Sequence, residues 1–219
     1  SFVPFIILYY NEFKKFKIDF SALKSKKKFI LNNYLLHFSR MISGSIDIII
    51  IAPIFGFAIL GNYALGMQFY MVLLIIPSII FQYIIPQDAT GNPSIVLKKI
   101  TVLASICIAI LGMIFSPIII KLMFPEFLEA VSIVQIISFG VIPGTINYMY
   151  ISKFLGNLQN KIILMSSSIF LISIILGMLI LGKLYGVHGM ATAFVAAGAI
   201  ESIFLIIADK FYKIQKKEM

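Results

Sequence analysis

Charged residues are scarce in this chain, which has 219 residues and only 12% Asp, Glu, Lys and Arg. Soluble domains carry about 25% charged and about 45–50% apolar residues. Here 60% of the residues are hydrophobic, and the mean hydropathy is +1.02. A water-soluble fold of this size could not bury so much apolar surface. The composition therefore excludes an ordinary soluble domain and predicts that lipid surrounds the chain.

Cysteine and histidine are also nearly absent. Cys107 is the only cysteine, so no disulfide can form within the chain. The two histidines, His37 and His188, show no metal-ligand spacing, and we expect neither a metal nor a cofactor. No charged segment precedes the apolar run after Ser1, which excludes a signal peptide. We interpret residues 1–10 as the end of an earlier membrane helix and the sequence as a fragment of a longer protein.

The net charge of +9 would suit a nucleic-acid-binding protein, but its distribution does not. Lysines cluster between the apolar stretches and in the C-terminal segment 209–219, with almost none inside the stretches. This arrangement is typical of segments beside a membrane, where lysines meet anionic lipid headgroups. The sequence therefore predicts contact with membrane lipid and no binding of nucleic acid.

Long apolar stretches make up most of the chain. A membrane-spanning helix needs about 20 mostly apolar residues, and six stretches, separated by glycine and proline, meet this requirement. They are residues 29–53, 62–85, 99–122, 130–153, 162–182 and 187–208. No loop between them is long enough for a separate domain. The predicted fold is all-α, a polytopic membrane bundle of six transmembrane helices over residues 29–208.

The distribution of lysines predicts the orientation of this bundle. When the segments between spans are assigned alternately to two sides, one side holds 15 lysines and the other only Lys121 and Lys183. Arg40 lies within a span. Because lysine-rich loops stay in the cytoplasm, we expect a multi-pass protein of the cytoplasmic membrane with its basic tail, 209–219, in the cytoplasm.

Residues 11–28 form a different kind of segment, a basic linker that we expect on the cytoplasmic side. Phe13, Phe16, Phe20 and Leu23 recur at spacings of three and four, with lysines on the other faces. This pattern favours an amphipathic helix lying among the lipid headgroups. The alternative is a solvated linker whose lysines only set the topology.

The first span carries an unusual row of polar or small residues. Asn33, His37, Arg40, Gly44 and Asp47 are separated by 4, 3, 4 and 3 positions, so they share one face of a helix. Charges inside a bilayer cost about 2.5–3.5 kcal/mol each on insertion scales and usually mark function. We interpret this face as the lining of a ligand cavity. The alternative is that Arg40 and Asp47 pair with neighbouring helices and only hold the bundle together.

Arg40 lies about 17 Å along the helix from Phe29, near the middle of a hydrocarbon core about 30 Å thick. Its guanidinium suits two-point binding of a phosphate better than an ammonium group does. Asp47 is about 10 Å further along, too far for a good direct pair. Its partner is therefore on another helix, or it binds a proton or a cation.

Other polar residues inside the spans give weaker signals. Gln68, Tyr70, Gln82, Gln135, Asn147 and Tyr148 either line the same cavity or make hydrogen bonds between helices. Glu201 lies toward the cytoplasmic end of the last span, where we expect a lysine partner. Pro77 predicts a bend in the second span, and Gly140, Pro143 and Gly144 predict one in the fourth. Gly189, Ala193, Ala196 and Ala197 predict a small-residue face for close packing.

Three stretches resemble a known transporter family. Residues 59–86, ILGNYALGMQFYMVLLIIPSIIFQYIIP, resemble the span of polysaccharide flippases that starts with LG-x-Y-A-L and ends at a proline. Residues 185–198, YGVHGMATAFVAAG, resemble the start of their last conserved span, and MFPEFLEAVSIVQIISFG resembles a short loop with its following helix. The chain is therefore similar to the Wzx-type oligosaccharide flippases of the MOP superfamily, relatives of the MATE exporters.

This resemblance implies that the six spans are the C-terminal lobe of a MATE-like transporter with twelve to fourteen helices, whose missing N-terminal lobe would be its partner. It also implies a central cavity in which cationic residues meet the pyrophosphate of the substrate, with Arg40 in a matching kind of position. We therefore expect no covalent chemistry, but the flipping of a lipid-linked (polyprenyl-diphosphate) oligosaccharide by alternating access, for surface polysaccharide biosynthesis.

In this hypothesis Arg40, His37 and Asn33 bind the diphosphate, and Asp47 takes the coupling proton or cation. Gln68, Asn147 and Tyr148 complete the cavity. A cation-coupled multidrug antiporter of the same fold is the first alternative, and it would favour acidic residues over an arginine at mid-depth. A membrane glycan polymerase or glycosyltransferase is the second, although the short non-cytoplasmic loops offer only Glu126, Glu129 and His188.

Overall fold

The computed structural model describes residue 51 and residues 53–218. Residues 1–50, 52 and 219 lie outside the described part. The predictions made for residues 1–10, for the linker 11–28 and for almost all of the span 29–53 therefore stay predictions. The same holds for Asn33, His37, Arg40 and Asp47.

The described residues are helical and contain no strand. The helices are α5 (Phe57–Leu73), α6 (Ile75–Ala89), α7 (Ile95–Met123), the short 3₁₀ helix η1 (Pro125–Phe127), α8 (Ala130–Ser138), α9 (Val141–Gly156) and α10 (Asn160–Glu218). The five predicted spans in this part of the chain fall in helical segments: 62–85 covers parts of α5 and α6, 99–122 lies in α7, 130–153 covers α8 and part of α9, and 162–182 and 187–208 both lie in α10. The predicted all-α architecture is therefore confirmed for the described part.

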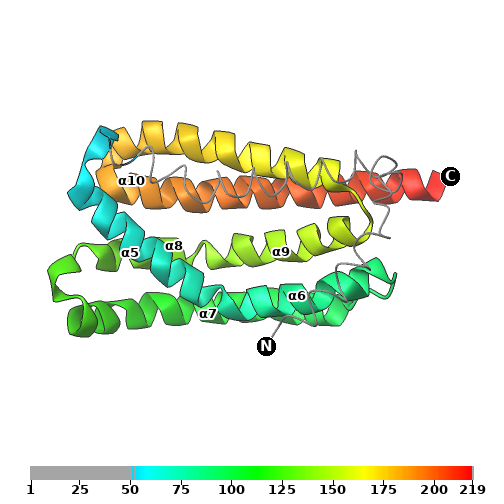
Figure 1. Cartoon of the computed structure of the whole chain (residues 1–219), viewed down its shortest axis with the longest axis horizontal. Coiled ribbons are helices and arrows are strands. Elements are labelled where there is room, and N and C mark those ends of the chain that lie inside the picture. Colours follow the sequence, from blue (N-terminus) through cyan, green and yellow to red (C-terminus); the bar gives the residue numbers. More distant parts are fainter. Residues whose placement is uncertain (1–50, 52, 219) are drawn as a thin grey trace, which may run out of the picture. The chain divides into compact units, whose positions relative to one another are not determined.

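Helix α10 consists of two antiparallel arms joined at Gly186 (Figure 1). Gly186 has φ 59° and ψ −138°, a conformation that residues with a side chain rarely adopt. The arms then lie against each other at small residues: a Cβ on Gly189 would be 1.9 Å from the Leu181 carbonyl oxygen, and one on Gly177 would be 2.8 Å from Cβ of Ala193. The predicted small-residue face is confirmed at Gly189 and Ala193.

Two other segments are broken where proline was expected to bend them. Helices α5 and α6 meet at Leu74 with an angle of 48°, three residues before Pro77. Helices α8 and α9 are separated at Phe139 and Gly140, three to four residues before Pro143. Proline has no N–H and its ring collides with the carbonyl group four residues earlier, so each break lies about one turn before its proline. The bend predicted at Pro77 is confirmed. Before Pro143 the helix is interrupted, but Phe139 and Gly140 keep right-handed helical φ and ψ angles, and Ala130–Gly156 continues as one apolar span.

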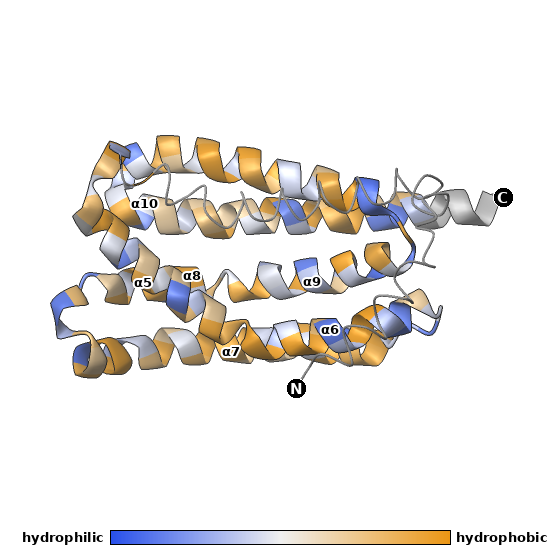
Figure 2. Ribbon diagram, in the orientation of Figure 1, coloured by the Kyte–Doolittle hydropathy of each residue, from blue (hydrophilic) through white to orange (hydrophobic). Residues whose placement is uncertain are grey.

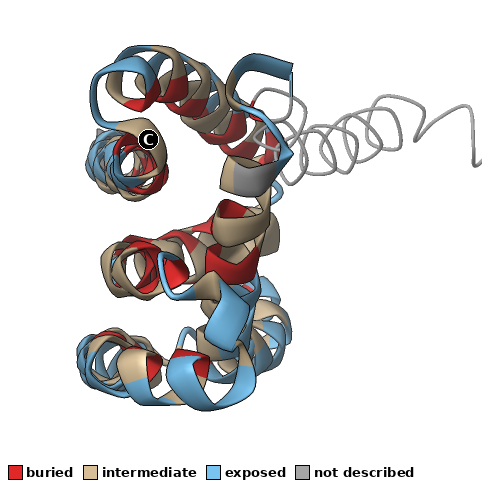
Figure 3. Ribbon diagram, turned by 90° about the vertical axis from the view of Figure 1, so that its left-hand side faces the viewer, coloured by how far each residue is buried: buried red, intermediate tan, exposed pale blue. Residues whose placement is uncertain are grey.

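The segment formed by α8 and α9 is the centre of the bundle. Helix α9 packs against α6, α7 and α10, while α8 packs against α5, α7 and α10. Half of the most apolar stretch of this segment is buried, against 22% for that of α7. The buried residues of the helices face one another, and their exposed residues face outward (Figure 3). Any cavity deep in this bundle is consequently bounded by α9.

Except at Lys99 and Lys121 near its ends, the outward face of α7 is apolar (Figure 2). Large exposed side chains on it are Ile95, Val96, Ile100, Leu103, Ile106, Ile110, Leu111, Ile114, Phe115, Ile118 and Leu122. By length and composition, α7, Ala130–Gly156 and Asn160–Tyr212 can each cross a membrane, and the bent pair α5–α6 can form a fourth span. Such a surface is unfavourable in water and favourable in hydrocarbon. The long apolar helices are therefore compatible with a membrane helix bundle.

Charged side chains gather at the two ends of the bundle. The start of α7, the end of α9 and the hydrophilic ends of both arms of α10 lie on the same side of the bundle (Figures 1 and 2). We call this side the basic end. Lys98, Lys99, Lys153, Lys161 and Lys210 lie there, whereas Lys121 and Lys183 lie at the opposite end. The predicted separation of lysines thus holds for the described helices. The assignment of the basic end to the cytoplasm stays a prediction.

Candidate functional site

A cavity of about 410 Å³ lies between α5, α9 and the two arms of α10. A volume of this size is within the usual range for small-molecule sites, about 300–1,000 Å³. Both helix breaks contribute to its wall, through Leu74 on one side and Gly140, Pro143 and Gly144 on the other. Irregular backbone at membrane depth is tolerated where it is buried in protein or lines a cavity. The broken helices and the cavity therefore form one structural unit.

Glycine residues on α9 make room for a tyrosine of α5. A Cβ on Gly144 would be 2.5 Å from Oη of Tyr70, and one on Gly140 would be 3.5 Å from the Tyr70 ring. Residues Met67, Tyr70, Met71 and Leu74 recur at spacings of three, one and three, so one face of α5 lines the cavity. Tyr70 consequently enters the cavity with its hydroxyl group against the α9 backbone.

The polar wall of the cavity is built around Asn147 and Glu201. Nδ2 of Asn147 donates a hydrogen bond to Oε2 of Glu201 at 2.9 Å, and Ser166 donates to Oε1 at 3.1 Å. Ser202 donates to Oδ1 of Asn147 at 2.7 Å. These four residues are buried and come from α9 and from both arms of α10. The network therefore joins three of the four helical segments that enclose the cavity, α9 and both arms of α10.

Aromatic rings cover the remaining wall. Tyr148 stacks on Phe81 with ring centroids 4.8 Å apart, and Tyr70 makes an edge-to-face contact with Phe194 at 4.9 Å. Phe170 lines the cavity as well, with its ring at right angles to that of Phe194. The cavity thus combines a carboxylate and an amide with the faces and edges of several rings. Such a wall suits a ligand that has both apolar faces and hydroxyl groups.

The structure brings together some of the residues predicted for the cavity and separates others. Asn147, Tyr148 and Tyr70 line it. Gln68 and Gln82 are exposed and are not among its lining residues. Gln135 instead donates a hydrogen bond from α8 to the Met113 carbonyl oxygen of α7 at 3.4 Å.

Glu201 was not among the residues predicted for the cavity. It lies eight residues before Asp209, about 12 Å along the helix axis from the basic end. The position toward that end agrees with the sequence, but its carboxylate faces the cavity and contacts Asn147 and Ser166. A rule that treats every intramembrane carboxylate as a site candidate would have identified it.

Comparisons of the chain with profiles of known protein families, with curated proteins and with solved structures find no match. The function must therefore be argued from the site itself.

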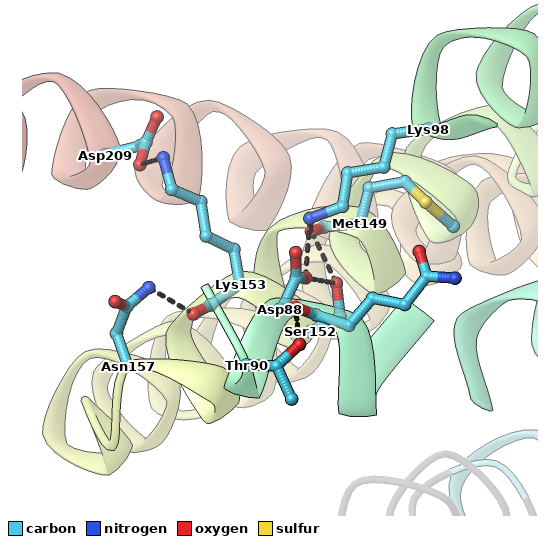
Figure 4. Close-up of polar contacts among 9 residues, drawn as sticks. Asp88, Thr90, Lys98, Met149, Ser152, Lys153, Asn157 and Asp209 are labelled. Carbon is cyan, nitrogen blue, oxygen red and sulfur yellow. Dashed lines mark hydrogen bonds and ion pairs between the residues drawn. The ribbon is translucent and has the colours of Figure 1, made fainter. Parts of the chain in front are cut away.

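A second polar cluster lies at the basic end (Figure 4). Nζ of Lys98 is 2.6 Å from Oδ2 of Asp88, and Ser152 donates to the same oxygen at 2.7 Å. Lys153 forms an ion pair with Asp209. Asp88 and Asp209 are almost completely buried. These contacts join the ends of α6, α7, α9 and α10.

At the opposite end, polar contacts join α5 and α8 and link α8 to the second arm of α10. Asn62 donates to Glu129 at 3.2 Å, and Ser132 is 2.8 Å from Nε2 of His188. Glu129 and His188 are exposed, and Asn62 and Ser132 are half-buried. Each contact is a single hydrogen bond between helix ends.

Proposed function

We propose that this chain belongs to a membrane transporter that flips a lipid-linked oligosaccharide across the cytoplasmic membrane by alternating access. The observation that carries the proposal is the cavity that contains the Asn147–Glu201 pair. Sugar hydroxyl groups both donate and accept hydrogen bonds, so an amide beside a carboxylate can bind them. The rings of Tyr70 and Tyr148 supply flat surfaces for the apolar faces of sugars.

The two broken segments support an alternating-access mechanism. Transporter sites near the bilayer midplane are typically formed by discontinuous helices that line a cavity. Here the breaks at Leu74 and Gly140 both belong to the cavity wall. Small rotations of the segments beyond each break would open the cavity to one side of the membrane or to the other.

Glu201 would couple this movement to a cation or a proton. Its carboxylate is held by donors from two elements, Asn147 and Ser166. Binding of a proton or cation would weaken these bonds and favour a different arrangement of the α10 arms. In the sequence-based hypothesis Asp47 had this role, and Glu201 now joins it as a candidate within the described residues.

A cation-coupled multidrug antiporter is the second candidate, and Glu201 is the observation that favours it. A carboxylate among aromatic rings is a suitable site for an organic cation. The two functions differ in the sign of the substrate charge. Efflux of a cationic dye that depends on Glu201, without movement of a lipid-linked sugar, would support the antiporter and contradict the flippase.

The experiment that tests the flippase proposal uses the full-length protein in proteoliposomes with a fluorescent lipid-linked oligosaccharide. We expect this lipid to move across the bilayer. We also expect the Arg40→Ala variant to flip it at least about tenfold more slowly, because one charge-assisted contact with the diphosphate is lost. Replacement of Lys161, which is exposed at the basic end, is the matched control. Unchanged flipping by Arg40→Ala at normal protein levels would remove the role given to Arg40. The absence of flipping by the unmodified protein would contradict the proposal.

A further inference from the structure

A second hollow lies outside the cavity, on the surface formed by α7, the end of α9 and the second arm of α10. We call it the lateral groove; its volume is about 780 Å³. It is lined by Pro93, Ile95, Lys98, Lys99, Val102, Leu103, Ile106, Ile146, Met149, Tyr150, Lys153, Ile206 and Asp209. None of these residues lines the cavity. The groove is therefore separate from the site described above.

The groove is charged at one end and apolar over the rest of its length. Lys98 and Lys99 stand at the start of α7, and Val102, Leu103 and Ile106 follow one to two turns deeper. From Lys98 to Ile106 the helix rises about 12 Å. Since α7 exposes an apolar face that suits lipid, the groove runs from the headgroup level into the hydrocarbon. This polarity matches that of a lipid molecule lying along the helices.

The lysines at the charged end are positioned by the ion pairs at the basic end (Figure 4). Asp88 holds Lys98 and Asp209 holds Lys153. An ammonium group has three donors. Lys98 donates one hydrogen bond to Asp88 and another to the Met149 carbonyl oxygen. The bond to Met149 is long, at 3.4 Å. Both lysines therefore keep donor capacity for a further acceptor while their positions are fixed.

The net charge of the charged end is positive. Its lining contains three lysines and one aspartate, a difference of +2, and Asp88 behind Lys98 reduces this to +1. Lys99 is exposed, and no ion pair is formed by it within the described part of the chain. Lys161 and Lys210 lie at the same end of the bundle but outside the groove. Basic pockets between membrane helices bind the headgroups of anionic lipids.

We propose that the lateral groove binds an anionic phospholipid. The phosphate lies among Lys98, Lys99 and Lys153, and an acyl chain lies along Val102, Leu103 and Ile106. Apart from the charged end, Tyr150 is the only polar residue in the lining, which leaves little to bind the sugars of a glycolipid. The lipid also bridges α7, α9 and α10, so its binding stabilises the bundle. This inference does not depend on which substrate the cavity transports.

The test is native mass spectrometry of the full-length protein, titrated with phosphatidylglycerol and phosphatidylcholine that carry the same acyl chains. We expect tighter binding of phosphatidylglycerol. Because one lysine near a membrane surface contributes about 1 kcal/mol to the attraction of anionic lipid, the Lys99→Gln variant should bind it about fivefold more weakly. Lys161→Gln, an exposed lysine outside the groove, is the matched control and should bind as the unmodified protein does.

A second variant tests the apolar part of the groove without changing any charge. Leu103 is exposed, so Leu103→Trp fills the groove without disturbing the core, and we expect it to weaken the binding of phosphatidylglycerol. Equal affinity for the two phospholipids would overturn the proposal. The proposal would also be overturned if Lys161→Gln lost as much affinity for phosphatidylglycerol as Lys99→Gln does. Displacement of phosphatidylglycerol by a lipid-linked oligosaccharide at equal concentration would overturn it as well.

Discussion

In the proposed transport cycle, replacement of Glu201 with glutamine is expected to reduce transport at least about tenfold, corresponding to about 1.4 kcal/mol or more. Glutamine has nearly the same shape and can still accept the hydrogen bond from Asn147, so the packing of α9 and α10 is kept. It has no charge and does not bind a proton in the range of pH at which a carboxylate does. The variant therefore removes the coupling group and leaves the fold intact. The measurement is the initial rate of substrate movement in proteoliposomes under an imposed ion gradient.

The matched control for this experiment is Glu129→Gln. Glu129 is exposed at the end of the bundle opposite the basic end and contacts Asn62. The same chemical change there should leave transport within about twofold, as expected for a surface substitution. Transport by Glu201→Gln at the unmodified rate, and with the unmodified ion dependence, would show that Glu201 only stabilises the helix packing.

Replacement of Gly189 with alanine is expected to destabilise the bundle by about 3 kcal/mol, the upper part of the usual range for overpacking. The new Cβ would be 1.9 Å from the Leu181 carbonyl oxygen and 3.1 Å from the Gly182 backbone nitrogen. Backbone atoms of the facing arm cannot rotate away as a side chain can. The two arms of α10 must therefore separate, and both enclose the cavity. The expected result is a lower unfolding temperature of the purified protein in detergent.

Gly198 provides the control for this substitution, since it lies on the same arm of α10. A Cβ there would be 3.6 Å from the Pro143 ring, an ordinary van der Waals distance. Alanine also favours a helix over glycine by about 1 kcal/mol, so Gly198→Ala should keep or raise the unfolding temperature. If the two variants unfold at the same temperature, the arms of α10 do not pack as closely at Gly189 as described above.

The sequence was most informative where covalent structure limits the backbone. The proline at position 77 correctly predicted the bend between α5 and α6, and the small residues Gly189 and Ala193 correctly predicted close packing of the last helix. The apolar stretches correctly predicted the helices, because a helix in lipid must satisfy its own backbone hydrogen bonds. These properties depend on the residues of one segment at a time.

The sequence was least informative about which face of each helix meets its neighbours. In α5 the cavity face consists of Met67, Tyr70, Met71 and Leu74, so Gln68 lies off this face. A helix that is apolar on all sides carries no periodic signal for its inward face. The position of a polar residue such as Gln68 was therefore not enough to place it in the cavity.

Contacts between residues that are far apart in the sequence also could not be predicted. Lys98 and Lys153 were interpreted only as topological signals, yet they pair with Asp88 and Asp209. Asn147 and Glu201 are 54 residues apart and meet because α9 packs on the second arm of α10. Tertiary packing determines such pairs, and neither periodicity nor composition contains that information.

The central claim is that water and substrate reach the cavity while the bundle is in the membrane. It is tested most directly by the reactivity of two thiols toward a membrane-impermeant, charged maleimide in intact membranes. One is the natural Cys107, which is exposed on the apolar helix α7 about 18 Å from its start. The other is the thiol of Tyr148→Cys in a Cys107→Ser background, in the cavity wall. We expect the thiol at position 148 to react in intact membranes and Cys107 to react only after denaturation. The central claim would be contradicted if the thiol at position 148 were as unreactive as Cys107 in intact membranes.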